Sequence, residues 1–135
     1  MFVDSNIFIF ANDGSYPEHA DAVRLLENAG EELRFNTIIA LETHYGYLRN
    51  LGPQEAEKRL RSMFESRLLG YCEVTKDDVL EGARISRDHG IKTNDATIIA
   101  NMLRNGTKTI ATNNVKDFEK HPGIRVVAPI GRGSS

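Results

Sequence analysis

Cysteine is nearly absent from this sequence, since Cys72 is the single cysteine among 135 residues. A lone cysteine cannot form an intramolecular disulfide, and it excludes a cysteine-rich zinc site. Cys72 follows Tyr71 in an apolar stretch, so we expect it to be a buried packing thiol rather than a nucleophile.

Long apolar runs and an excess of positive charge are missing as well. No run approaches the roughly 20 apolar residues that a transmembrane helix needs, so no membrane partner is expected. The opening MFVDSN carries no basic segment ahead of its apolar residues, unlike a secretory signal, and we expect a cytoplasmic protein. The net charge of −2 gives no indication of nucleic-acid binding. It does not exclude such binding either, because local charged patches rather than the net charge govern contact with phosphates.

What is present fits one soluble domain. The chain is 40% hydrophobic and 27% charged, and its length suits a single core without disulfides. We place this domain at residues 1–130. The tail at residues 131–135 (GRGSS) lacks apolar side chains, and we expect it to be disordered.

Short apolar stretches alternate with helical patterns along the chain. Strands are predicted at residues 1–3, 34–36, 71–74, 108–112 and 124–127, with Pro129 ending the last. Helices are predicted at residues 6–10, 15–30, 37–50 and 75–90. Two more are predicted, one that starts at Gly52-Pro53 and includes Phe64, and one that runs from Thr93 to just before Gly106. Strands separated by helices imply crossover connections, so we predict an α/β fold with a mostly parallel sheet covered on both faces.

Local signals set the ends and faces of these helices. Capping boxes are predicted at residues 15–18 and 75–78, and caps at Thr37 and Thr93. Gly90 and Gly106 should lie at helix ends. The spacing predicts core-facing side chains at Ile38, Leu41, Tyr45, Leu48, Ala56, Leu60, Met63 and Phe64.

Four carboxylates lie where a parallel sheet gathers its ligands, near the carboxyl ends of strands. Asp4 follows the first strand directly, and Asp117 follows the fourth. Glu42 and Asp95 lie in the early turns of two helices. Carboxylate oxygens suit Mg²⁺ or Mn²⁺, ions that can activate water for attack on a phosphate.

Each acid also has a structural interpretation. Asp4 could cap a helix, and Asp95 could interact with a helix dipole. Glu42 could be an exposed helix residue and Asp117 a turn residue. Glu42 borders an apolar face, however, where a partly buried carboxylate needs a partner.

Three stretches of the chain resemble the PIN domain family, and most closely its VapC toxins. These are FVDSNI at residues 2–7, IALE at residues 39–42, and the long block at residues 90–118, which includes TNDATIIA and TNNVKDF. The ending GIRVVAP at residues 123–129 also resembles that of the family. The resemblance covers nearly the whole chain and implies a three-layer α/β/α sandwich with strand order 3-2-1-4-5.

The resemblance also implies roles for these residues. Asp4 and Asp95 would be direct ligands of Mg²⁺ or Mn²⁺, and Glu42 a ligand or a holder of metal-bound water. Asp117 would bind a second metal or orient a water. The supporting residues would be Ser5, Asn6, Thr112, Asn113 and Asn114. Many relatives have an aspartate where this chain has Asn114, which weakens the case for a second metal.

The implied activity is hydrolysis of RNA phosphodiester bonds by a homodimeric toxin that a VapB-type antitoxin blocks. A non-toxin PIN nuclease of RNA maturation or decay, or a catalytically silent binding module, are the alternatives. The candidates for RNA contact are Arg49, Lys58, Arg59, Arg61, Arg67, Tyr45 and Tyr47, although the basic residues can equally form a solvated helix surface and Tyr45 is expected in the core. The four histidines suggest no zinc site.

Overall fold

A computed structural model describes residues 1–128 of the chain. Its elements are, in order, β1 (Phe2–Val3), α1 (Ser5–Ala11), α2 (His19–Asn28), β2 (Leu33–Asn36), α3 (Thr37–Leu51), α4 (Pro53–Glu65), β3 (Leu69–Cys72), α5 (Lys76–His89), α6 (Thr93–Arg104), β4 (Thr109–Ala111), α7 (Val115–Glu119) and β5 (Arg125–Val127). The predicted strand-ending Pro129 and the predicted disordered tail at residues 131–135 lie outside the described residues.

The five strands form one parallel sheet in the order β3-β2-β1-β4-β5, as predicted. β1 lies in the middle, where Phe2 is paired with Arg34 of β2 on one side and with Ile110 of β4 on the other. The strand order reverses between β1 and β4. In open α/β sheets, such a switch point at the carboxyl ends of the strands is the usual place for a ligand.

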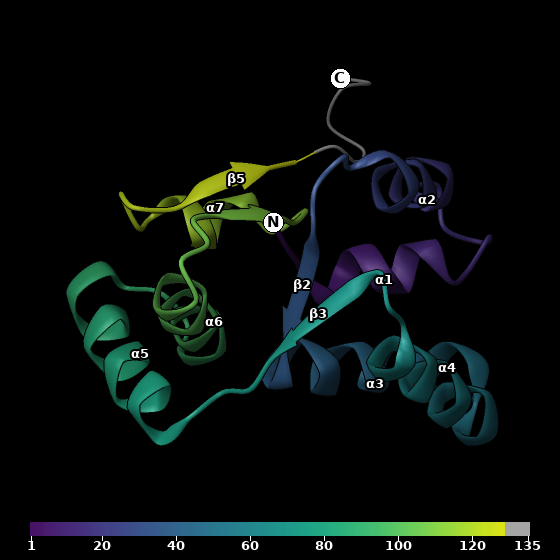
Figure 1. Cartoon of the computed structure of the whole chain (residues 1–135), viewed down its shortest axis with the longest axis horizontal. Helices are drawn as coiled ribbons and strands as arrows, with labels where there is room; N and C mark the ends of the chain where they lie inside the picture. Colours follow the sequence, from purple (N-terminus) through teal and green to yellow (C-terminus); the bar gives the residue numbers. More distant parts are fainter. Residues whose placement is uncertain (129–135) are drawn as a thin grey trace.

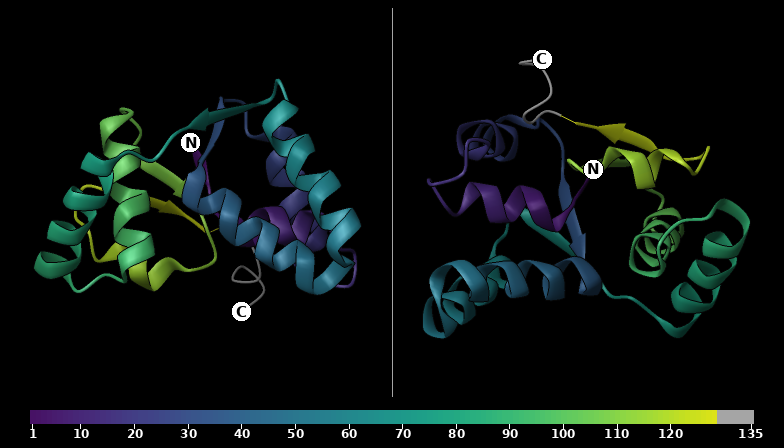
Figure 2. Two further views of the ribbon diagram at one scale, coloured as in Figure 1. Left: turned by 90° about the horizontal axis from the view of Figure 1, so that it is seen from below. Right: turned by 180° about the vertical axis from the view of Figure 1, so that it is seen from behind.

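Helices cover both faces of the sheet and make it the middle of three layers, again as predicted (Figures 1 and 2). α1 to α4 gather on one side, and α5 and α6 lie on the other. This arrangement follows from right-handed crossovers, because the chain moves outward from β1 to β3 and then returns to β4 and β5 in the opposite direction. α3 and α6 therefore approach each other from opposite layers.

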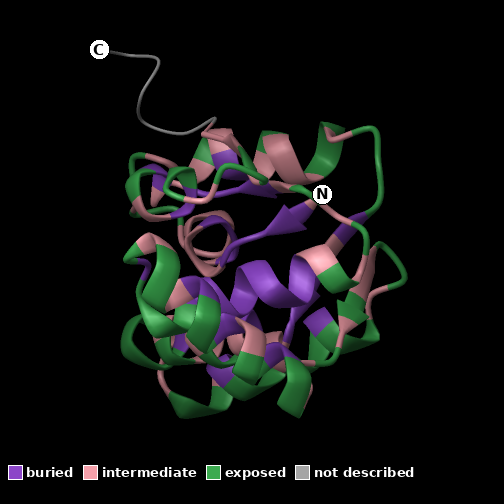
Figure 3. Ribbon diagram, turned by 90° about the vertical axis from the view of Figure 1, so that its left-hand side faces the viewer, coloured by how far each residue is buried: buried purple, intermediate pink, exposed green. Residues whose placement is uncertain are grey.

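The core lies on both faces of the sheet, where buried side chains of the strands meet the inner helix faces (Figure 3). Phe2, Phe35 and Ile110 are fully buried. α6 is the most deeply buried helix, with every residue from 95 to 102 inside. Gly82 of α5 permits this packing, because a Cβ there would lie 2.7 Å from Thr97 Cα. No helix among residues 1–128 is long and apolar enough to traverse a bilayer.

The predicted inner face of α3 is wrong at three of its four positions, while Ile38 is partly buried against the core as expected. Leu41 and Tyr45 are 67% and 62% exposed, and Leu48 is also exposed. The buried residues are instead Ile39, Ala40, Thr43 and Tyr47. Apolar side chains occur on both faces of this helix, so their spacing alone could not tell which face meets the core.

Phe64 of α4 was predicted to point inward, but it is also largely exposed. Its ring packs at the edge of the core, with its centroid 5.3 Å from that of Phe35 and 4.9 Å from that of Tyr71. Ala56 and Met63 are buried as expected. Cys72 packs against the core but is only partly buried.

Several predicted helix caps were also wrong by a few residues. Ser15 caps no helix and instead donates to Asp13, while α2 begins only at His19. Asn36 replaces Thr37 as the cap of α3, because its Oδ1 atom accepts from Ile39 N at 3.0 Å. The Thr93 hydroxyl does not cap α6, which starts after Lys92 without a side-chain cap. The box at Thr75 and Asp78 and the end at Gly90 are confirmed.

Candidate active site

Asp4 is held at the carboxyl end of β1, where it also caps α1. Its Oδ1 atom accepts a hydrogen bond from Ser5 N at 2.8 Å. Its Oδ2 atom accepts from Thr112 Oγ1 at 2.7 Å and from Asn6 Nδ2 at 3.3 Å. Burial raises the pKa of Asp4, and these three hydrogen bonds oppose the rise. The helix-cap and active-site interpretations are therefore compatible.

Glu42 reaches the same region from α3, with a half-buried side chain. Its Oε1 atom accepts from Ser5 Oγ and its Oε2 atom from Asn94 Nδ2, both at 3.4 Å. Burial raises the pKa of Glu42, and the negative charge of Asp4 raises it further. Glu42 is thus one of the acids at the switch point rather than a solvated helix residue.

Asp95 lies in the first turn of α6 and is 8% exposed. Burial raises its pKa to about 7, and the charges of Asp4, Glu42 and Asp117 contribute to the rise, in that order. Burial is the largest of these causes, and the contribution of three neighbouring carboxylates shows that negative charge is concentrated around Asp95. We call the cavity beside it the acidic hollow, a space of about 410 Å³ lined by Glu42, Lys92, Thr93, Asn94, Asp95 and Asn114.

Asp117 lies on α7 at the edge of this hollow, in a different environment. The Nδ2 atom of Asn114 donates to Asp95 Oδ2 and to Asp117 Oδ2, each at 3.1 Å. Lys120 Nζ lies 3.5 Å from Asp117 Oδ1, and Lys92 Nζ lies 4.0 Å from its Oδ2. These partners, Asn114 first, lower the pKa of Asp117.

The five predicted supporting residues all lie around these acids. Besides bonding Asp4, Thr112 Oγ1 accepts from Asn114 N at 3.0 Å and from Asn6 Nδ2 at 3.2 Å. Asn6 Oδ1 accepts from Asn113 N at 3.1 Å, which joins the start of α1 to the loop after β4. The sequence analysis missed Asn94, Lys92 and Lys120. Asn94 directly precedes Asp95, and this position was the signal that could have revealed it.

The sequence model of the PIN domain covers most of the chain, from residue 1 to residue 124. The chain belongs to the PIN domain family. This confirms the family expected from the three motifs. The comparison with curated proteins gives no match.

Solved structures share this PIN fold. VapC20 of Mycobacterium tuberculosis, described as a toxin that cleaves the sarcin–ricin loop, has a TM-score of 0.81 at 22% identity, covering 95% of this chain and 98% of its own. A toxin–antitoxin complex from Klebsiella pneumoniae has a TM-score of 0.69 at 22% identity, with 95% and 96% covered. VapBC2 of Rickettsia felis, bound to a promoter DNA fragment, has a TM-score of 0.69 at 17% identity, with 93% and 96% covered. At such identities the likeness establishes the fold alone.

The donor set of this PIN domain fits a hard divalent ion in its chemistry, since it consists of carboxylate oxygens beside amide and hydroxyl groups. In the arrangement described for residues 1–128, no three acidic, histidine or cysteine side chains are close enough to hold one ion together. Glu42 and Asp95 are turned toward the amides of Asn94 and Asn114. To chelate an ion, each of these two carboxylates would have to give up its hydrogen bond from the amide and bind the ion instead.

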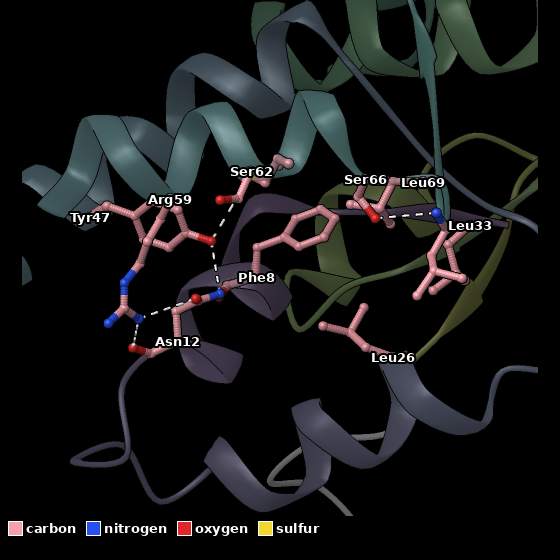
Figure 4. A pocket seen from close by; sticks show the side chains of 11 residues that line it. Phe8, Asn12, Leu26, Leu33, Tyr47, Arg59, Ser62, Ser66 and Leu69 are labelled. Carbon is pink, nitrogen blue, oxygen red and sulfur yellow. Dashed lines mark hydrogen bonds between the residues drawn. The ribbon is translucent and has the colours of Figure 1, made fainter.

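A second hollow, of about 370 Å³, lies among α1, α2 and α4 and contains none of the four acids (Figure 4). Its walls are largely apolar, and its polar corner is formed by Asn12, Tyr47 and Arg59. Arg59 donates to Asn12 O at 2.8 Å and pairs with Glu55, while Arg61 pairs with Glu57. These two arginines, which were candidates for RNA contact, thus have partners within the chain.

Proposed function

We propose that this PIN domain is a Mg²⁺- or Mn²⁺-dependent endoribonuclease and the toxin of a VapBC-type pair. The observation that supports this most is the convergence of Asp4, Glu42 and Asp95, which come from three distant segments. Burial, together with the negative charges of Asp4 and Glu42, raises the pKa of Asp95 to about 7. A divalent cation is the simplest partner for such a cluster.

Asp4 and Asp95 are the proposed ligands, and Glu42 completes the cluster as a ligand or by holding a water. A bound Mg²⁺ or Mn²⁺ would supply a water nucleophile at neutral pH and stabilise charge on the phosphate. Thr112 and Asn6 fix Asp4 in one orientation, because both donate to its Oδ2 atom. Asn94 and Ser5 hold Glu42 in the same way.

The partners are proposed from the similar structures. Two of them contain a toxin with its antitoxin, and VapC20 is described as a toxin that cleaves the sarcin–ricin loop. We infer that a VapB-type antitoxin inhibits this chain, with an arginine that reaches the acidic hollow, because guanidinium pairs well with carboxylate. A homodimer is also proposed, and the exposed apolar side chains of Leu41, Tyr45 and Leu48 on α3 support it.

Cleavage of RNA by the purified chain tests the function. We expect cutting with Mg²⁺ or Mn²⁺, no cutting with EDTA, and loss of cutting in Asp4→Asn and Asp95→Asn. Asp77→Asn is the matched control, because Asp77 is an exposed carboxylate on α5. Full activity in both active-site variants would refute the proposal.

Two alternatives keep the same fold. A chain that binds Mn²⁺ but cuts no RNA would be a silent binding module, to which the amide at Asn114 gives some support. A nuclease whose expression does not arrest growth would belong to RNA maturation or decay. Growth arrest that a co-expressed antitoxin relieves would identify the toxin.

A further inference from the structure

The acidic hollow has one positively charged edge. Lys92 Nζ lies 4.0 Å from one Asp117 oxygen, and Lys120 Nζ lies 3.5 Å from the other. Lys120 also donates to Gly90 O at 3.2 Å, so its ammonium group is fixed between α7 and the end of α5. Two positive charges around one carboxylate leave this edge with a net charge of about +1.

The rest of the hollow has the opposite charge. Asp4, Glu42 and Asp95 contribute three carboxylates to one small region, where burial raises the pKa of each of them and the charge of Asp4 raises the pKa values of Glu42 and Asp95 further. A polyanion such as RNA would be repelled there. A strand can reach the hollow only if nearby cations offset part of this repulsion.

Lys92 is placed to do this. It lines the hollow together with Glu42 and Asp95, and its side chain is 81% exposed. Its contact with Asp117 is long, so the ammonium group can turn toward a phosphate at small cost. Arg59 and Arg61 of α4 are less suitable, because both already pair with glutamates of their own helix.

Resting on the proposed function, we propose that Lys92 and Lys120 each bind a backbone phosphate of the RNA strand at this edge. Phosphate contacts of this kind fix the register of a strand without reading its sequence. The lysines thus place the strand beside the three carboxylates, and the choice of RNA target depends on other contacts.

Binding of a labelled single-stranded RNA to the full chain tests this, by fluorescence anisotropy in EDTA so that nothing is cut. Lys92→Ala and Lys120→Ala should each weaken binding about 3- to 10-fold and lower the slope of log affinity against log salt by about 0.7, the value for one phosphate contact on a single strand. Lys92→Arg should retain most of the affinity. Lys108→Ala is the control, because Lys108 is an exposed lysine directly before β4, at the opposite edge of the sheet, and it should change binding less than about twofold.

Each outcome decides the matter. Unchanged affinity and slope in both alanine variants, or an equal loss in Lys108→Ala, would overturn the assignment while leaving RNA cleavage by the wild-type chain intact. If binding of an acidic peptide depends on the two lysines and binding of RNA does not, the proposal is overturned and this edge binds a protein partner instead. Failure of the wild-type chain to bind or cut any RNA would refute both this assignment and the proposed function.

Discussion

Two buried aspartates on the α5–α6 side of the sheet have opposite environments. Asp78 is 2% exposed, and although burial raises its pKa, its hydrogen bonds from Arg104, Asn101 and Thr75 outweigh this and lower the pKa to about 2. Asp95 is 8% exposed, and burial together with three neighbouring carboxylates raises its pKa to about 7. The charge of Asp78 is thus balanced by an arginine of the chain, whereas the charge around Asp95 is left for a bound partner to balance.

This difference separates a structural carboxylate from a functional one. Arg104 donates to both oxygens of Asp78, at 2.7 and 3.0 Å, and also to Glu73 O. Such a paired and hydrogen-bonded group stabilises the folded state. The acids of the hollow repel one another and lower stability in the free protein, a cost typical of sites that bind a charged ligand.

Asp95→Asn should show the largest effect, and in opposite directions on activity and stability. We expect RNA cleavage to fall about 10²- to 10³-fold, the usual cost of losing an electrostatic group at an active site. The free energy of unfolding of the metal-free protein should be unchanged or higher, because an amide removes one of the repelling charges. Urea denaturation beside the cleavage assay checks both. A marked loss of stability would show that Asp95 is structural after all.

Asp78→Asn should have the next largest effect, on stability alone. Loss of a buried carboxylate bonded to an arginine costs roughly 1.5–3 kcal/mol, with the lower end favoured because Arg104 is partly exposed. Urea denaturation measures this cost, and Asp77→Asn is the control. Cleavage per folded molecule should hardly change. A stability loss no greater than that of the control would remove the contrast between the two sites.

The pH dependence of stability in the metal-free protein should follow from the same contrast. A carboxyl whose pKa is lowered in the folded state stabilises above its unfolded pKa, so the contribution of Asp78 is lost from about pH 4 down to pH 2. A carboxyl whose pKa is raised has the opposite sign, so Asp95 makes stability fall from about pH 4 up to pH 7. Melting temperatures across this range test both limbs. In Asp95→Asn, the fall in melting temperature between about pH 4 and pH 7 should be smaller than in the wild type. If the fall is as large in this variant, a group other than Asp95 causes it.

The position of the acids could be predicted from the sequence because topology dictates it. A residue after a central parallel strand lies at the switch point whatever its neighbours are, and Asp4 after β1 is such a residue. Asp95 was recognised through the motif around it. The contact of Lys92 with Asp117 was missed, because it depends on how α6 and α7 pack. Lys120 lies three residues after Asp117, and this helical spacing could have revealed their pairing.

The link between the two aspartate sites could not be predicted either. Asn36, which caps α3, donates to Asn101 Oδ1 at 3.0 Å, and Asn101 in turn donates to Asp78 Oδ2 at the same distance. This buried chain connects the helix that carries Glu42 with the helix that carries Asp95. Its members lie up to 65 positions apart and follow no short motif, so only the folded arrangement reveals them.

The smallest effect is expected for Asp117→Asn on Mn²⁺ binding, although the family resemblance implies a metal-related role for Asp117. Its charge is already balanced by Lys92, Lys120 and the Asn114 amide, which lower its pKa. Asp117 is also the last of the three carboxylates that raise the pKa of Asp95, so its removal should affect the unbalanced acids little. We expect Mn²⁺ affinity, measured by calorimetry, to fall less than about threefold, against about 10- to 100-fold or more for Asp95→Asn. An equal loss of Mn²⁺ affinity in both variants would show that Asp117 is a ligand. The four acids would then be equivalent, and Asp117 would not differ from the other three through its contacts with the lysines.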